Sequence, residues 1–367
     1  MMPSEPKRTV VVFWSRRGGA LSPTILELAE LQARRPDLNV IVNVSDRNDL
    51  AADLAKLTPH VEMFETFSSA LGALTGLPRL FGRLRRLVAG WKKNNVSTVI
   101  VFLPHVWTPI LGYYVRKAGM RYAMVIHDAD PHLGDPTAYL NSWIHCDVKH
   151  ADIVYSMSQS VAEKLAQQWR IPASRIVKLF LPRFTNPTPR PPRPHTPLRV
   201  LFLGRILAYK GLPLLIEAVE KLRADGVAVA LGIAGEGDIA ELRPRLATLG
   251  AEVVNTWMTN SQVNDILSRY DIVVLPYIEA SQSGVVTSAF STGLPVVVTP
   301  VGGLPEQVED GVTGLITTAP TADAIADCLR KFSDPALYKK MVPNIDRRQQ
   351  DFSVEAFAEG ALAPLKD

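Results

Sequence analysis

Two basic side chains follow an apolar segment in the second half of the chain, at a spacing that suits phosphate binding. Arg205 comes two residues after the expected strand at 198–203, and Lys210 stands five residues further on, beside Gly211. Arginine offers a planar fork and lysine a point charge, so the pair matches the oxygens of a diphosphate. In α/β proteins ligands bind where parallel strands end. We therefore expect Arg205 and Lys210 to bind a diphosphate there. The alternative interpretation is two solvent-exposed basic residues near the start of a helix.

Three further motifs follow this pair in a fixed order. They are the segments 234–237 (AGEG), 276–293 (PYIEASQSGVVTSAFSTG) and 295–314 (PVVVTPVGGLPEQVEDGVTG). With the Gly-Arg and Lys-Gly pairs, the ordered set resembles the carboxyl-terminal domain of retaining glycosyltransferases of the GT-B fold, in particular glycosyltransferase family 4. The resemblance is strong over 198–320 and weak over the rest of the chain.

The resemblance implies roles for individual residues of the second half. Arg205 and Lys210 hold the leaving diphosphate of a nucleotide-sugar donor and count as catalytic. The glycine of the Ser283-Gly284 turn allows backbone N–H groups at a helix start to approach phosphate oxygens. The implied donor-binding residues of this half are Gly204, Glu236, Glu279, Ser283, Gly284, Val285 and Glu306.

The sequence departs from the family pattern at one place. The family carries two glutamates eight positions apart before the helix that ends at the residue matching Gly293, and these contact the donor sugar and the ribose. Ala280 and Ser288 occupy those positions here. Glu279 lies one residue away from the first position, so either it serves through a local bulge or it is a surface carboxylate.

The first half carries weaker matches to the same family. Gly18 and Gly19 follow the first expected strand, where GT-B proteins place a glycine loop near the phosphates; otherwise the pair is an ordinary turn. His127 ends another strand, at a position where the family often has a histidine that reaches the donor sugar, and we count it as catalytic. The alternative for His127 is a structural histidine. His105 ends the preceding strand and is a weaker candidate.

Strand and helix patterns alternate along the whole chain. Continuous apolar, β-branched runs such as 9–14 are typical of parallel strands that are buried on both faces. The expected strands are 9–14, 39–43, 98–102, 122–126, 153–156, 198–203, 227–234, 272–276 and 295–299, with helices at 21–34 and from about 212. This alternation predicts an α/β protein with two doubly wound, Rossmann-like domains, which in the GT-B arrangement face each other across an interdomain cleft.

A proline-rich segment marks the expected domain boundary. Seven of the sixteen residues from 182 to 197 are proline, which excludes a helix or a central strand there. We expect an amino-terminal, acceptor-side domain over 1–184, a linker over 185–197 and a nucleotide-sugar-binding domain over 198–340. A helical tail, 341–367, is expected to pack back on the first domain.

Composition and charge exclude several classes of protein. The chain has 367 residues, 47% hydrophobic and 21% charged, which excludes disordered and fibrous classes. No G-x-G-x-x-G follows either first strand, which argues against a nicotinamide oxidoreductase. The absence of an apolar leader and the presence of only two cysteines, Cys146 and Cys328, favour a reducing, cytoplasmic location.

A basic segment in the first half suggests an anionic surface as a partner. The net charge is +4, with 23 basic and 15 acidic residues in 1–185 and 17 and 21 in 186–367. Residues 79–93 form an expected amphipathic helix with an apolar stripe and a basic face. We expect this helix to bind the cytoplasmic face of a membrane; alternatively, its stripe packs on the sheet. The candidate membrane or acceptor-side residues are Arg79, Arg83, Arg85, Arg86 and Trp91.

These observations favour a retaining glycosyltransferase that moves a hexose from a UDP- or GDP-sugar to an acceptor. The family suggests a lipid-linked glycan of bacterial surface polysaccharide or exopolysaccharide synthesis. A nucleotide-sugar epimerase and a non-catalytic sugar-nucleotide-binding homologue remain alternatives. Asp128 and Asp130 resemble a metal-binding Asp-x-Asp pair, but we interpret them as a turn and expect no metal cofactor. No motif for reading nucleic acid is present.

Overall fold

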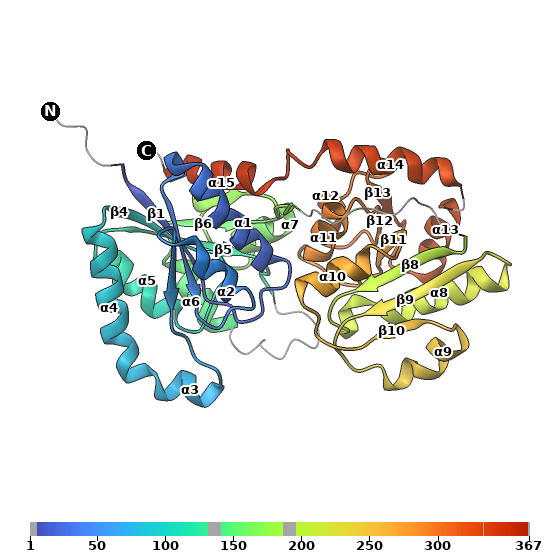
Figure 1. The fold of residues 1–367 in the computed structure, drawn as a ribbon, viewed down its shortest axis with the longest axis horizontal. Helices are drawn as coiled ribbons and strands as arrows, with labels where there is room; N and C mark the ends of the chain where they lie inside the picture. The colour runs from blue at the N-terminus through green and yellow to red at the C-terminus, as the bar shows by residue number, and fades with distance from the viewer. Residues whose placement is uncertain (1–5, 131–140, 186–195, 333, 366–367) are drawn as a thin grey trace. The chain divides into compact units, whose positions relative to one another are not determined.

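The chain folds into two compact α/β units. The structure is a computed structural model that describes residues 6–130, 141–185, 196–332 and 334–365. Among these, the first unit comprises 6–130, 141–180 and 354–365, and the second comprises 181–185, 196–332 and 334–353 (Figure 1). Most of the expected linker, 186–195, lies outside the described residues.

The first unit is built on a parallel sheet of seven strands in the order β3-β2-β1-β4-β5-β6-β7. The strands are β1 (Arg8–Phe13), β2 (Val40–Ser45), β3 (Val61–Phe64), β4 (Val96–Val101), β5 (Arg121–Ile126), β6 (Ile153–Ser156) and β7 (Ile176–Lys178). The helices are α1 (Leu21–Arg34), α2 (Ala51–Leu54), α3 (Ala70–Thr75), α4 (Leu77–Lys93), α5 (Thr108–Lys117), α6 (Asn141–Lys149), α7 (Gln159–Gln167) and α15 (Val354–Leu362). From Thr9 onward every residue of β1 is buried, as its continuous apolar run predicts.

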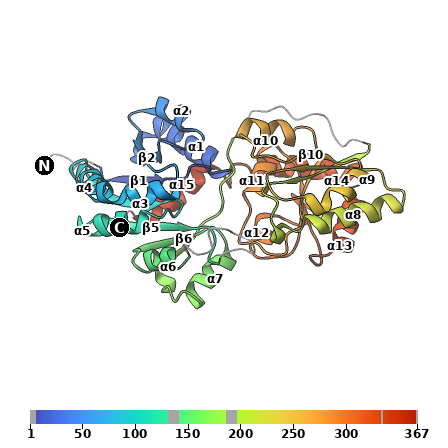
Figure 2. The same cartoon turned by 90° about the horizontal axis from the view of Figure 1, so that it is seen from below.

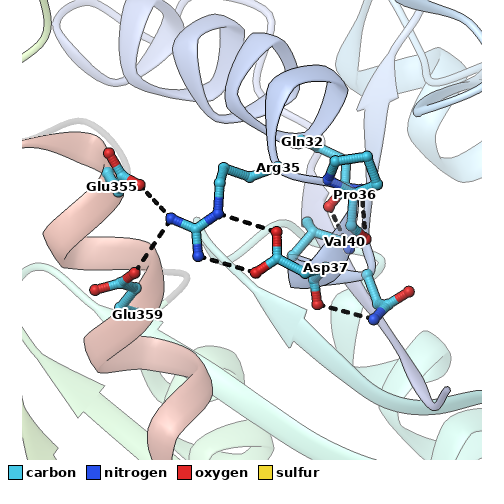
Figure 3. A network of polar contacts seen from close by, with 8 residues as sticks. Gln32, Arg35, Pro36, Asp37, Val40, Glu355 and Glu359 are labelled. Carbon is cyan, nitrogen blue, oxygen red and sulfur yellow. Dashed lines mark hydrogen bonds and ion pairs between the residues drawn. The ribbon is translucent and has the colours of Figure 1, made fainter.

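Helix α15 joins the first unit although it lies at the far end of the sequence. Its Phe357 is 4% exposed in the same core cluster as Phe102, the residue that directly follows β4. Tyr155 donates a hydrogen bond of 2.6 Å to the carbonyl of Ala361. Arg35, at the end of α1, forms ion pairs with Glu355 and Glu359 and with its neighbour Asp37 (Figure 3). Of the expected tail, it is therefore α15 that packs on the first unit.

The second unit has a parallel sheet of six strands in the order β10-β9-β8-β11-β12-β13. The strands are β8 (Leu198–Leu203), β9 (Val229–Ala234), β10 (Glu252–Val254), β11 (Ile272–Leu275), β12 (Val296–Val298) and β13 (Gly314–Ile316). The helices are α8 (Leu212–Ala224), α9 (Arg243–Thr248), α10 (Asn260–Leu267), α11 (Gly284–Ser291), α12 (Leu304–Gln307), α13 (Ala322–Lys331) and α14 (Pro335–Arg347). Helices α8 and α13 lie side by side and share one core cluster with the sheet (Figures 1 and 2). Helices α10 and α11 pack in the other cluster.

The expected strands are confirmed, with ends that shift by up to two residues, whereas the edge strands of both sheets were not predicted. The strands β3, β7, β10 and β13 are only three or four residues long. In β10 two of the three residues are exposed, so no continuous apolar run marks it in the sequence. Helix α14 also runs past residue 340 to Arg347, which leaves 341–353 with the second unit and not with the expected tail.

The basic helix is present as α4, but one of its expected surface residues is buried. Leu80, Leu84, Val88 and Trp91 form its buried stripe, and Trp91 is 1% exposed. The Nε1 atom of Trp91 donates to Glu62 over 2.8 Å, so this side chain belongs to the core of the unit. The assignment of Trp91 to a membrane-facing surface is therefore wrong, because the sheet uses the stripe on which it lies.

Candidate functional site

The motif loops of the second unit meet at one edge of its sheet. Strands β9, β8, β11 and β12 are neighbours and run parallel, so their carboxyl ends lie on the same side. The strand order proceeds from β8 through β9 in one direction and from β11 through β12 in the other. The reversal between β8 and β11 creates the crevice in which open α/β sheets bind ligands. The Gly-Arg pair follows β8, and the loop 276–283 follows β11.

Close backbone contact joins the first two motifs. Gly235 has φ +149°, and a Cβ atom there would lie 2.0 Å from the carbonyl oxygen of Gly204, so only glycine fits. The N–H of Ile206 donates to the carbonyl of Glu236 over 2.8 Å. The side chain of Glu236 is exposed beside the Gly-Arg turn. The spacing of these motifs therefore has a structural cause, which is the pairing of the two loops.

Lys210 is buried at the crevice in contact with a tyrosine. Lys210 is only 8% exposed, and its Nζ donates a hydrogen bond to the hydroxyl of Tyr277 over 2.6 Å. The same Nζ lies 4.3 Å from the centre of the Tyr277 ring, within cation–π range. Burial raises the pKa of Tyr277 to about 12, with the positive charge of Arg205 opposing the rise, so the hydroxyl stays protonated at neutral pH. Arg205 itself is exposed.

Ser283 begins helix α11 next to this pair. Its Oγ accepts from the N–H of Val285 over 3.2 Å and lies 3.3 Å from the Tyr277 hydroxyl. The side-chain amide of Gln307 accepts from the N–H of Ser283 over 2.7 Å and donates to its carbonyl over 3.1 Å. The partial positive charge of a helix N-terminus favours an anion there. Lys210, Tyr277, Ser283 and the start of α11 thus form one arrangement that suits phosphate oxygens.

Ala280 and Ser288, which occupy the positions of the two family glutamates, make structural contacts. Ser288 is 6% exposed on α11, and its Oγ donates to the carbonyl of Gly284 over 2.9 Å. A Cβ atom on Gly302, which has φ +52°, would overlap the carbonyl oxygen of Ala280, so the GG-x-PE turn packs directly on this loop. Glu279 and Glu306 are both exposed, on the loop after β11 and on α12.

The candidates in the first unit lie at the carboxyl edge of its own sheet. Gly18 and Gly19 are half-buried in the turn after β1. His127 follows β5, and its Nε2 lies 2.9 Å from the carbonyl oxygen of Phe102. A carbonyl only accepts, so Nε2 carries the proton. Burial lowers the pKa of His127, which favours the neutral ring with Nδ1 as its acceptor atom.

The neighbouring candidates of the first unit are held by local contacts. His105 accepts from the backbone N–H of Trp107 over 3.2 Å through Nδ1, and burial lowers its pKa to about 4. Asp130 forms an ion pair of 2.7 Å with Lys164. Within the described residues, no group of three or more His, Cys, Asp or Glu side chains is arranged to hold a metal ion.

Two residues at the candidate site were missed by the sequence analysis. Tyr277 contacts Lys210, and Gln307 fixes Ser283. Tyr277 directly follows the strand β11 and Pro276, and Gln307 directly follows the motif residue Glu306. Their positions inside recognised motifs could have marked them as site candidates. The contacts themselves could not be predicted, because Tyr277 is 67 residues from Lys210 and Gln307 is 24 residues from Ser283.

Comparisons with known proteins show which proteins the second unit resembles. Residues 197–334 match the family described as Glycosyl transferases group 1. The chain is 32% identical over 163 residues to D-inositol 3-phosphate glycosyltransferase of Corynebacterium aurimucosum, covering 41% of this chain and 39% of the relative. It is 31% identical over 164 residues to the colanic acid biosynthesis glycosyltransferase WcaL of Salmonella typhimurium, covering 41% and 39%. The chain thus matches about two fifths of the length of these relatives.

A longer match and the solved structures extend the likeness beyond the second unit. Alpha-D-kanosaminyltransferase of Streptomyces kanamyceticus is 25% identical over 298 residues, or 75% of this chain and 76% of the relative. A glycosyltransferase from Rickettsia africae has a TM-score of 0.73 at 18% identity and covers 98% of both chains. Anabaena Alr3699/HepE in complex with UDP and glucose has a TM-score of 0.71 at 16% identity, with 99% of this chain and 100% of that chain covered.

The expected α/β fold with a parallel sheet in each of two units is therefore confirmed. The chain has the fold of the glycosyltransferase structures to which it is similar, and residues 197–334 match the group 1 glycosyl transferases, with relatives that act in polysaccharide biosynthesis.

Proposed function

We propose that the chain transfers a hexose from a nucleotide sugar to an acceptor, with retention of configuration at the anomeric carbon. The observation that carries this proposal is the arrangement of Lys210, Tyr277 and Ser283 at the point where the strand order of the second sheet reverses. A cationic side chain and a helix N-terminus beside one another suit the diphosphate of a nucleotide sugar.

In this proposal the two basic residues act on the leaving group. Lys210, fixed by Tyr277, and the exposed Arg205 neutralise the negative charge that develops on the diphosphate as the glycosidic bond breaks. The same diphosphate helps to deprotonate the incoming hydroxyl on the same face of the sugar. Positive charge from the protein performs the task that a bound cation performs elsewhere, so the proposal includes no metal cofactor.

The donor is proposed to be a UDP- or GDP-sugar. Support comes from HepE, a neighbour in fold whose structure contains UDP and glucose. Sugar and ribose recognition must differ from the family pattern, because Ala280 and Ser288 carry no carboxylate. Glu279, exposed on the loop after β11, is the proposed substitute; Glu236 and Glu306 are proposed to line the donor region. His127, neutral through burial, is proposed to donate or accept a hydrogen bond at the sugar.

The acceptor is proposed to be a lipid-linked glycan of bacterial surface polysaccharide or exopolysaccharide synthesis. Its support is the similarity to WcaL, a colanic acid biosynthesis glycosyltransferase, together with the basic charge of residues 1–185. Such an acceptor would bring the protein to the cytoplasmic face of the membrane as a peripheral protein. No helix in the described parts of the chain is long and apolar enough to span a bilayer.

Two alternatives differ in what they do with the donor. An epimerase would convert the nucleotide sugar without any acceptor, and a non-catalytic homologue would bind it without turnover. One neighbour in fold, a UDP-N-acetylglucosamine 2-epimerase from Listeria monocytogenes, has a TM-score of 0.62 at 14% identity, which concerns the fold alone. The group 1 glycosyltransferase match and the named relatives favour transfer.

The test begins with thermal shifts of the protein with UDP-, GDP- and ADP-sugars, because a ligand at a hundred times its Kd stabilises the fold by about 2.7 kcal/mol. The stabilising donor is then incubated with lipid-linked glycans, and acceptor-dependent release of nucleoside diphosphate is measured. Arg205→Ala and Lys210→Ala should each lower this rate about a hundredfold, or about 3 kcal/mol. Near-normal turnover in both variants would refute the proposed clamp, and conversion of the donor without acceptor would favour the epimerase.

A further inference from the structure

Large apolar side chains are exposed on and around helix α3. Leu71 and Leu74 of α3 are 70% and 66% exposed, the highest values for large apolar side chains in the described residues. Phe81 on α4 is 47% exposed and Met63 on β3 is 40% exposed. Scattered apolar residues need no explanation, but Leu71 and Leu74 stand three positions apart on one face of α3, and exposed apolar side chains grouped in this way indicate an interaction surface. Figure 1 shows α3 beyond the amino-terminal end of α4, at the margin of the first unit.

This apolar segment is continuous with a strongly basic one. From Thr66 to Lys93 the sequence has no aspartate or glutamate and six basic residues. Arg79, Arg85 and Arg86 are exposed along α4, as are Lys92 and Lys93 at its end. The remaining basic residue, Arg83, donates to the backbone carbonyl of Glu65 over 2.8 Å and lies over the ring of Phe64. Arg83 is therefore partly engaged by the protein itself.

The buried stripe of α4 cannot take part in binding a partner. Leu80, Leu84, Val88 and Trp91 are covered by the core of the first unit. Phe81 projects 100° away from Leu80 on a helix of 3.6 residues per turn, and Arg85 lies on the same flank four residues later. The surface that remains for a partner thus consists of α3, Phe81 and the exposed basic side chains of α4.

We propose that α3 and the amino-terminal half of α4 form a docking surface for an anionic lipid bilayer. Leu71, Leu74 and Phe81 enter the boundary between headgroups and acyl chains, while Arg79, Arg85 and Arg86 bind lipid phosphates. Charge complementarity selects a bilayer as the occupant, because the exposed apolar side chains lie in a segment, 66–93, that has six basic residues and no acidic one, which matches an anionic interface. The buried Trp91 takes no part in this surface, which consists of side chains that solvent reaches. Binding of the bilayer does not depend on the proposed sugar transfer.

The experiment is flotation of the full chain with vesicles of phosphatidylcholine and with vesicles that also contain phosphatidylglycerol. The wild type should float with the anionic vesicles at 0.1 M salt and lose most of this binding at 1 M, where the Debye length falls from about 10 Å to about 3 Å. The double variant Leu71→Ser, Leu74→Ser should weaken partitioning about tenfold. The variant Arg79→Glu, Arg85→Glu, Arg86→Glu should weaken it at least about a hundredfold.

Matched controls distinguish binding through this surface from non-specific apolar or electrostatic binding to vesicles. Val253→Ser removes an exposed apolar side chain from β10, and Arg243→Glu, Lys339→Glu, Lys340→Glu reverses three exposed charges of the second unit. Both controls should float like the wild type. Circular dichroism and thermal melting of every variant establish that it is folded, since the substituted side chains are exposed.

Two results would overturn the proposal. The first is equal binding of wild type and both α3–α4 variants to anionic vesicles, or no binding by any of them. The second is a dimer in sedimentation that the Leu71→Ser, Leu74→Ser variant abolishes while no form binds vesicles, which would assign the surface to a second copy of the chain. Neither result concerns the donor, because nucleotide-induced thermal shifts report on the second unit and are measured separately.

Discussion

The side-chain amide of Gln307 binds both the N–H and the carbonyl of Ser283, at 2.7 and 3.1 Å. The amide thereby makes with Ser283, the residue that begins α11, the pair of hydrogen bonds that the backbone of a neighbouring strand would make. The contact joins the GG-x-PE motif to the loop after β11, so that two motifs of the candidate site are held together.

We expect Gln307→Met to weaken binding of UDP about tenfold. Methionine keeps the volume of the side chain but removes both hydrogen bonds, each worth about 1 kcal/mol, and so loosens the start of α11. Isothermal titration with UDP measures the effect. Gln167→Met, at the exposed end of α7, is the matched control and should bind UDP as the wild type does. Unchanged affinity in Gln307→Met would show that Ser283 needs no such support.

The hydroxyl of Tyr277 is expected to act through Lys210. Tyr277→Phe keeps the ring beneath the Lys210 ammonium but removes the acceptor at 2.6 Å. We expect kcat/KM to fall about tenfold, with little change in the free energy of unfolding.

A double-mutant cycle distinguishes this positioning role from a structural one. In a Lys210→Ala background, Tyr277→Phe should change kcat/KM less than about twofold, because its partner is gone. Tyr209→Phe leaves the Tyr277 hydroxyl in place and serves as the control. Additive losses in the double variant would argue that Tyr277 contacts the substrate or supports the fold by itself.

Removal of divalent cations is expected to leave the proposed transfer intact. Arg205 and Lys210 supply the positive charge at the diphosphate in the proposed mechanism. The rate is measured after dialysis against EDTA and after addition of Mn²⁺. A loss that Mn²⁺ restores would contradict the proposal and direct attention to Asp128 and Asp130, of which Asp130 pairs with Lys164.

The stability of the first unit is expected to fall in mild acid because of His105. Its imidazole lies among the rings of Trp14, Phe67 and Trp107, and burial lowers its pKa to about 4. An unfolded histidine titrates near pH 6.5, so the unfolded chain binds more protons between about pH 6.5 and 4. The contribution of His105 to the free energy of unfolding is therefore complete above about pH 6.5. It decreases as the pH falls, by about 1.4 kcal/mol per pH unit.

Urea unfolding at pH 7 and pH 5 tests this sign by comparison with His105→Gln. The wild type should lose about 2 kcal/mol more than the variant over this interval. The comparison is needed because Asp147 acts in the opposite direction: burial raises its pKa to about 6, so the folded state gains a proton as the pH falls. His60→Gln is the control. Parallel losses in wild type and His105→Gln would exclude His105 as the source.

The attachment of α15 is expected to depend on burial more than on its ion pairs. Phe357 is 4% exposed, and Phe357→Ala should cost about 3–5 kcal/mol of the free energy of unfolding. Arg35→Ala, which removes the contacts to Glu355 and Glu359 in Figure 3, should change stability little, because exposed ion pairs are screened by water. Chemical denaturation measures both. A larger loss for Arg35→Ala would reverse this order.

Local sequence determined much of this protein. Continuous apolar runs such as those of β1 and β8 define central strands, because a strand buried on both faces must be apolar at every position. The Gly-Arg, Lys-Gly and GG-x-PE motifs also predicted which loops follow which strands, and hence the similarity to group 1 glycosyl transferases over 197–334. Short edge strands such as β10 carry no such signal, since only one side of them is paired and most of their residues face water.

Tertiary structure decided the contacts between segments that are distant in the sequence. It selected Tyr277 and Gln307 as partners of Lys210 and Ser283, because packing of β11 beside β8 and of α12 beside α11 brings their side chains within hydrogen-bond distance. It also divided the amphipathic helix α4, burying Trp91 and exposing Phe81. Helical periodicity places both residues on or near one stripe, and only the area that the sheet covers determines which of them reaches solvent.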